Sequence, residues 1–213
     1  MLKKIKRIYY RIEYMFRMLN EYSRIYTEYS NKEKNIIISD YARLYNVDMD
    51  GPNSIGRFCH ISNTELGKYT YCASNCNIFN STIGNYCSIG PNVNIGFGTH
   101  PTFFKSTHPI FYAVNNPLGL RHVNKNLFNQ KEPVEIKHDV WLGANAIINN
   151  GVKIDIGAII GANSFVNKDV GPYEIWAGNP AKFIKKRFDE NTIVRLLSEK
   201  WWFNEPDDIQ ALM

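Results

Sequence analysis

The chain has 213 residues, 44% of them hydrophobic and 21% charged, which is enough for one ordinary domain with a buried core. An aromatic content of 14% and nine prolines exclude the disordered, collagen-like and low-complexity classes. No apolar stretch approaches the roughly 18 residues of a membrane span, and charges interrupt residues 1–24, so we predict a soluble, cytoplasmic protein. The four cysteines lack the paired spacing of a metal site, and we interpret them as packing residues.

The net charge of +5, from 25 basic and 20 acidic residues, is unevenly distributed. Five basic residues stand in the first eleven positions and the remainder is close to neutral, which argues against a nucleic-acid partner. Apolar residues spaced by three and four over residues 1–30 predict an amphipathic helix. We interpret it first as a helix that packs on its own domain or oligomer. The alternative is a peripheral membrane contact through residues 1–24, at the inner face of the membrane.

A six-residue repeat begins at residue 53 and resumes after residue 133. Small residues mostly precede the aliphatic ones by two positions, and the spacing shortens to five before Leu66 and before Ile83. A period of six fits neither a helix nor a simple alternating strand, and it predicts a solenoid of short strands with corners at glycine or asparagine. The aliphatic or small apolar positions are Ile55, Ile61, Leu66, Cys72, Ile78, Ile83, Ile89, Ile95, Ile136, Leu142, Ile148, Ile154, Ile160 and Val166.

The repeat divides the chain into three segments. We predict an N-terminal helical segment at 1–52, a solenoid domain at 53–187 and a C-terminal helical tail at 188–213. The solenoid is interrupted by an excursion loop at 97–133, and loops of this length are often functional. This loop contains three of the five histidines, namely His100, His108 and His122.

The repeat and four further stretches, GTHP, VEIKHDVWLGANAIINNGVKI, AIIGANSFVNKDV and AGNPAK, resemble the hexapeptide-repeat acyltransferases. The branch most similar contains galactoside and maltose, xenobiotic, and polysaccharide O-acetyltransferases, and the resemblance covers about 53–187. It implies a mainly β fold, the left-handed parallel β-helix. It also implies a homotrimer with active sites between subunits, acetyl-CoA as the donor and no requirement for a metal.

The match PNVNIGFGTHP implies that His100 is the catalytic histidine. A histidine titrates near neutral pH, so it can accept the proton of a hydroxyl that attacks a thioester. His108 either lines the acceptor pocket or makes a hydrogen bond within the loop. The match SNCNI nominates Asn75, with Asn77 as its neighbour, for the acceptor site. The alternative for this pair is an asparagine ladder at a solenoid corner.

The resemblance also implies a coenzyme A groove along the second repeat block. Small side chains there would let the pantetheine arm approach the backbone, and lysines would meet its phosphates as point charges. Trp141 has the alternative of packing in a subunit interface. The residues that the resemblance assigns to coenzyme A binding are Trp141, Ala144, Ala162, Asn167, Lys168, Lys182 and Lys185.

We predict an acetyl-CoA-dependent O-acetyltransferase that acts on a sugar hydroxyl of a surface polysaccharide or its precursor. Two other enzymatic hypotheses remain open. One is a xenobiotic O-acetyltransferase for chloramphenicol-type or streptogramin-type hydroxyls, and the other is an amino-sugar N-acyltransferase. A catalytically silent trimeric scaffold is the alternative outside the enzymes.

Overall fold

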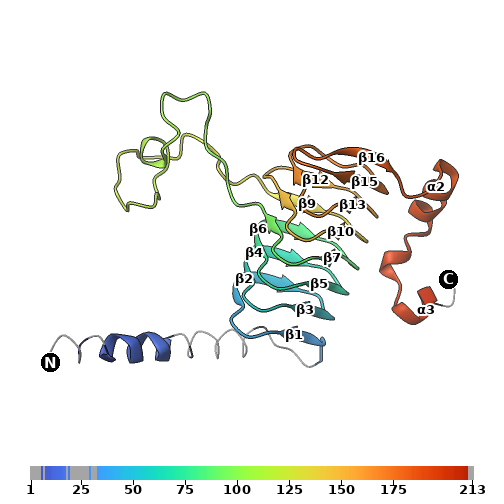
Figure 1. The fold of residues 1–213 in the computed structure, drawn as a ribbon, viewed down its shortest axis with the longest axis horizontal. Helices are drawn as coiled ribbons and strands as arrows, with labels where there is room; N and C mark the ends of the chain where they lie inside the picture. The colour runs from blue at the N-terminus through green and yellow to red at the C-terminus, as the bar shows by residue number, and fades with distance from the viewer. Residues whose placement is uncertain (1–5, 7, 18, 20–28, 30–32, 211–213) are drawn as a thin grey trace.

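The computed structural model describes residues 6, 8–17, 19, 29 and 33–210. Its centre is a stack of short strands wound into a solenoid, from which a long loop and the N-terminal helix project (Figure 1). One sheet has the order β1 (Ile36–Ile38), β3 (Asn53–Ile55), β5 (Thr70–Cys72), β7 (Ser88–Ile89), β10 (Trp141–Leu142), β13 (Ile159–Ile160), β15 (Glu174–Ala177) and β16 (Lys182–Lys186). The strands run parallel from β1 to β15, and β16 then pairs antiparallel to β15.

The second sheet forms the other faces of the solenoid. It contains long strands in the N-terminal coils and short ones in the C-terminal coils. Its strands are β2 (Arg43–Met49), β4 (His60–Leu66), β6 (Asn77–Ile83), β8 (Asn94–Ile95), β9 (Val134–Ile136), β11 (Ile147–Ile148), β12 (Lys153–Ile154) and β14 (Phe165–Val166).

The core is a column of aliphatic side chains that repeat from coil to coil. Each aliphatic position of the predicted repeat is at most 2% exposed. Leu142, for example, pairs with Ile89 on one neighbouring coil and with Ile160 on the other. The predicted fold class, a left-handed parallel β-helix with terminal helices, is therefore confirmed.

The corners of the coils explain why the repeat spacing varies. Asn63 and Asn80 adopt positive φ angles of 49° and 48° inside β4 and β6, so each strand bends through a corner without a separate turn. Asparagine tolerates this left-handed conformation better than most residues. The corner therefore needs one residue fewer, which produces the five-residue steps before Leu66 and before Ile83.

The solenoid begins earlier than the sequence predicted. Strands β1 and β2 lie in the segment 1–52 that we expected to be helical, and Ile38 pairs with Ile55 in the same buried column. The glycine that follows many repeat positions is replaced by Ser39 after Ile38, so the pattern is too weak to recognise in the sequence. Pairing with the next coil, which is not local in sequence, makes this segment extended.

Helical structure near the N-terminus covers residues 6, 8–17 and 19, and the rest of 1–24 lies outside the described residues. The described apolar side chains of this helix are 45–65% exposed, so they do not pack on the solenoid of the same chain. No helix in the described ranges is long and apolar enough to cross a bilayer.

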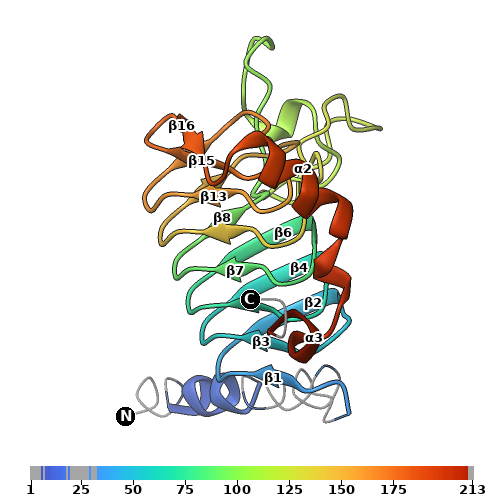
Figure 2. The same ribbon diagram turned by 90° about the vertical axis from the view of Figure 1, so that its right-hand side faces the viewer.

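The C-terminal segment lies along the side of the solenoid as a strap (Figure 2). Within it Trp202 is buried and stacks on His138 with ring centroids 5.5 Å apart, and the Asn85 side chain donates to the Trp202 carbonyl at 2.9 Å. The strap therefore closes one corner of the solenoid. It is composed of α2 (Glu190–Glu199), the 3-10 helix η2 (Trp201–Phe203) and α3 (Pro206–Gln210).

Candidate functional site

The excursion loop leaves the solenoid after β8. Gly96 has a φ of +66°, and a side chain there would collide with the Phe79 carbonyl, so glycine is required where the chain turns out. Asn150 joins the two ends of the loop. Its side chain accepts from the Gly98 N–H at 3.1 Å and donates to the Gln130 carbonyl at 2.6 Å. The loop is therefore fastened to the second repeat block at its base.

The loop has a small aromatic core of its own. Tyr112 follows the 3-10 helix η1 (Pro109–Phe111) and is fully buried. Its ring packs edge to face against Phe104 and Phe128, with centroids 6.1 Å and 5.8 Å away. The Leu127 N–H donates to the Tyr112 carbonyl at 2.8 Å, which joins the outgoing and returning halves. These contacts give the loop a defined shape without the repeat.

His100 is exposed near the start of this loop. Its Nδ1 atom lies 2.8 Å from the Thr107 carbonyl oxygen and 2.8 Å from the Tyr112 hydroxyl oxygen. A carbonyl can only accept, so the hydrogen-bond network assigns the proton to Nδ1. In the neutral ring, Nε2 then carries the lone pair that a general base needs.

His108 serves the local structure of the loop. It caps η1, with its Nδ1 accepting from the Ile110 N–H at 3.2 Å, and its own N–H donates to the Ser106 hydroxyl at 3.2 Å. This geometry matches the loop hydrogen bond that was one of its two predicted roles. The cap also fixes the preceding residue, Thr107, whose carbonyl contacts His100.

Asn75 and Asn77 lie on the solenoid rather than on the loop. Asn75 is an exposed corner residue with a φ of +63°, and the Asn77 side chain donates to that of Asn94 on the next coil at 3.0 Å. The Asn77–Asn94 bond is a ladder contact between paired strand positions of adjacent coils. The role of Asn75 and Asn77 toward an acceptor stays a prediction.

The predicted coenzyme A residues lie on the later coils. Trp141 is 54% exposed and pairs with Ile159, which places Ala144 and Ala162 at equivalent corners of adjacent coils. Within the described part of the chain, these residues share no hydrogen bond or ring contact with His100. The exposed polar members are Asn167 and Lys168 after β14, and Lys182 and Lys185 on β16.

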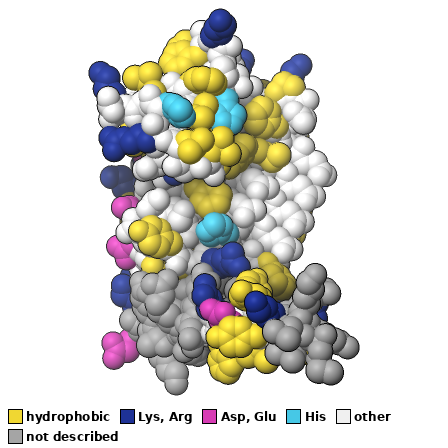
Figure 3. Space-filling model, turned by 90° about the vertical axis from the view of Figure 1, so that its left-hand side faces the viewer, with side chains coloured by type: hydrophobic (Ala, Val, Ile, Leu, Met, Phe, Trp, Pro, Cys, Tyr) yellow, Lys and Arg dark blue, Asp and Glu magenta, His cyan; other side chains and the backbone are white. Residues whose placement is uncertain are grey.

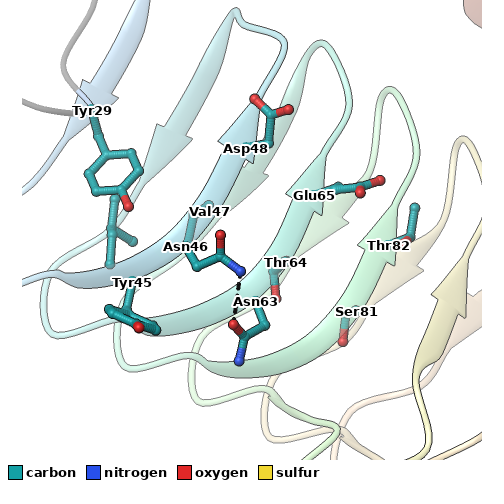
Figure 4. A pocket seen from close by; sticks show the side chains of 11 residues that line it. Tyr29, Tyr45, Asn46, Val47, Asp48, Asn63, Thr64, Glu65, Ser81 and Thr82 are labelled. Carbon is teal, nitrogen blue, oxygen red and sulfur yellow. Dashed lines mark hydrogen bonds between the residues drawn. The ribbon is translucent and has the colours of Figure 1, made fainter.

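A polar groove that sequence reasoning missed runs along the N-terminal coils. It follows the corner formed by Asn46 and Asn63, whose side chains are joined by a 2.9 Å hydrogen bond (Figure 4). Its lining also includes Asp48 and Glu65, which face each other on β2 and β4. The five-residue steps in the repeat were the available signal, because they mark this corner. Histidine and apolar side chains gather above it over the loop (Figure 3).

The four cysteines are buried free thiols inside the solenoid. Burial raises the pKa of the Cys72 thiol and raises that of Cys87 to about 12, so both stay protonated at neutral pH. Across the residues described here, no group of three histidine, cysteine or carboxylate side chains could hold a metal ion.

Comparison with known proteins adds sequence and fold relatives. No family model matches the chain. A chloramphenicol acetyltransferase of Klebsiella aerogenes is 40% identical over 114 residues, which are 54% of this chain and 53% of that protein. The chain thus matches only about half the length of this curated relative.

Two solved structures share the fold. Galactoside acetyltransferase in complex with coenzyme A superimposes with a TM-score of 0.54 at 26% identity, over 70% of this chain and 68% of that one. A hexapeptide-repeat containing acetyltransferase of Vibrio cholerae in complex with acetyl coenzyme A gives 0.53 at 24% identity, over 68% and 72%. In its repeat, its fold and its sequence relatives, the chain is similar to the hexapeptide-repeat acetyltransferases.

Proposed function

We propose that the protein is an acetyl-CoA-dependent O-acetyltransferase with His100 as its general base. The observation that carries this proposal is the contact of His100 Nδ1 with the Thr107 carbonyl, which leaves the Nε2 lone pair available. The similarity to acetyltransferases, two of them solved with coenzyme A or acetyl coenzyme A, supports the choice of donor.

The proposed reaction is a direct transfer. Nε2 takes the proton of the acceptor hydroxyl while the oxygen attacks the thioester carbonyl carbon. The carbon–sulfur bond of the tetrahedral species then breaks, and the thiolate of coenzyme A takes the proton back from Nε2. The products are the acetyl ester and free coenzyme A, and the imidazole is neutral again.

Donor binding is assigned to the later coils. Ala144 and Ala162 have small side chains, so that an extended pantetheine could approach these corners and hydrogen-bond to the backbone. Asn167 and Trp141 would lie beside it. Lys168, Lys182 and Lys185 are exposed cations suited to the phosphates. Because no hydrogen bond or ring contact joins His100 to these residues within the described part of one chain, we propose that the site is completed between the subunits of a homotrimer.

For the acceptor, we propose a sugar hydroxyl of a surface polysaccharide or its precursor, with Asn75, Asn77 and His108 nearby. A second candidate is a xenobiotic hydroxyl, and the 40% identity to a chloramphenicol acetyltransferase favours it specifically. Both acceptors present a hydroxyl to the same base.

The test measures thiol release from acetyl-CoA with a panel of sugars, oligosaccharides and chloramphenicol. We expect acceptor-dependent release that His100→Ala lowers by at least about a hundredfold, because general-base catalysis contributes about that much. His122→Ala is the matched control, since His122 is another exposed histidine of the same loop. Unchanged release by His100→Ala would overturn the assignment of the base.

We also propose that the N-terminal helix contacts the inner face of a membrane. Its described apolar side chains are exposed, and basic residues lie between them. Cosedimentation with anionic liposomes at low salt tests this. Failure of the full-length protein to sediment would return the helix to a packing role in the trimer.

A further inference from the structure

Tyr112 is the buried residue whose hydroxyl reaches the candidate base. Its oxygen lies 2.8 Å from His100 Nδ1, although its side chain is fully removed from solvent. The backbone on both sides is fixed, because its N–H donates to the Pro109 carbonyl at 3.1 Å and its carbonyl accepts from Leu127 at 2.8 Å. The hydroxyl is thus held in place by the loop, independently of His100.

The two neighbours of Nδ1 determine how the hydroxyl is used. The Thr107 carbonyl oxygen, also 2.8 Å away, can only accept a hydrogen bond. If the Tyr112 hydroxyl donated to Nδ1, the nitrogen lone pair would face the Thr107 oxygen at that distance, which is repulsive. The favourable arrangement has one Nδ1–H shared between two acceptors, the carbonyl and the phenol oxygen.

We infer that Tyr112 is a positioning residue for His100. This inference rests on the proposed function. Together with Thr107, the phenol oxygen fixes the orientation of the imidazole and keeps its proton on Nδ1. When Nε2 takes the acceptor proton, the ring becomes a cation, and the same two acceptors then make charge-assisted hydrogen bonds that are stronger than before.

The surroundings of Tyr112 keep the phenol in the form this role needs. Burial raises the pKa of its hydroxyl, so it remains a neutral phenol at the pH of an assay. Its ring packs edge to face against Phe104 and Phe128, which holds it in the aromatic core of the loop. Packing and hydrogen bonding therefore act on the same side chain.

The test is Tyr112→Phe, which removes the hydroxyl and keeps the ring in the aromatic core. We expect kcat to fall by about tenfold, with the KM for donor and acceptor within about twofold, since one charge-assisted hydrogen bond is lost in the transition state. The acid limb of the pH–kcat profile should move to lower pH, because the protonated ring loses an acceptor. Tyr173→Phe is the control, since Tyr173 is a buried tyrosine just before β15 that packs against Phe188.

A second measurement does not depend on knowing the acceptor. Nitrogen NMR of ¹⁵N-histidine-labelled protein, with His100 assigned by its absence in His100→Ala, reports which ring nitrogen carries the proton. We expect the Nδ1–H form in the native protein and a shift toward a mixture in Tyr112→Phe. Unchanged nitrogen shifts together with an unchanged kcat would overturn the inference.

The outcomes separate this inference from the proposed function. If His100→Ala abolishes activity while Tyr112→Phe behaves like Tyr173→Phe, the base stands and the positioning role is wrong. If His100→Ala stays active, the assignment of the base in the proposed function is wrong, whatever Tyr112→Phe shows. A thermal melt of each variant identifies any loss of folding.

Discussion

The solenoid and the excursion loop are stabilised in different ways. In the solenoid, each buried aliphatic residue contacts an equivalent one on the coils before and after, as Ile148 does between Ile95 and Val166. In the loop, order depends on a few specific contacts, chiefly the Asn150 clamp and the aromatic core around Tyr112. Stability is therefore distributed along the solenoid, whereas the geometry of the candidate base depends on single residues.

This difference separates two classes of substitution. A change in the buried column should lower the free energy of unfolding and affect activity only through folding. A change in the loop contacts should lower activity while most of the folding free energy remains. Two experiments test the separation, in addition to those proposed above, and a third tests the strap.

The largest effect on stability is expected for Ile148→Ala in the buried column. Ile148 is completely buried, so its truncation removes apolar contacts and leaves a cavity between two coils. We expect the free energy of unfolding, measured by urea denaturation at fixed protein concentration, to fall by about 2–5 kcal/mol. Leu118→Ala, at a 58% exposed loop position, should change it by less than about 0.5 kcal/mol. Equal losses in the two variants would contradict the comparison.

An intermediate effect is expected for Asn150→Ala at the base of the loop. The substitution removes both hydrogen bonds that join Gly98 and Gln130, at a cost of about 1 kcal/mol each. We expect kcat to fall by about tenfold, because His100 lies two residues beyond Gly98, and protease cleavage within 97–133 to become faster.

The neighbouring variant Asn149→Ala is the control, since the backbone N–H of Asn149 still donates to Val166. Normal kcat and normal protease resistance in Asn150→Ala would show that the aromatic core alone holds the loop.

The smallest effect is expected at the strap, from the pH dependence of His138. Burial, and to a lesser extent Lys137, lowers the pKa of His138 below its usual 6.5, and its Nδ1 accepts from the Asn85 N–H at 2.9 Å. The unfolded chain therefore binds the proton more readily. Stability is fully present above about pH 6.5 and decreases as the pH falls through the folded-state pKa.

We expect Tm to fall by about 2 °C between pH 7.5 and pH 5.5 because of this group, which is only half-buried. His138→Asn should remove that part of the pH dependence. A native protein and a His138→Asn variant with parallel Tm profiles would exclude His138 as the source.

The sequence by itself determined the solenoid from residue 53 onward and its buried column, and the resemblance of its motifs nominated His100 as the candidate base. These features are local and periodic, because each aliphatic residue recurs after a fixed interval and GTHP immediately follows a repeat. The resemblance carried by these motifs also predicted that the sequence relatives and the fold relatives would be acetyltransferases.

Only the tertiary structure decided the rest. Strands β1 and β2 are extended because they pair with the coil that follows them. Asn150 meets the loop ends from 52 and 20 residues away in sequence, and Tyr112 meets His100 across 12. Such contacts depend on where the folded chain returns, because a side-chain hydrogen bond has no periodic pattern. For this reason the sequence could nominate His100 but could not show which atoms hold its ring.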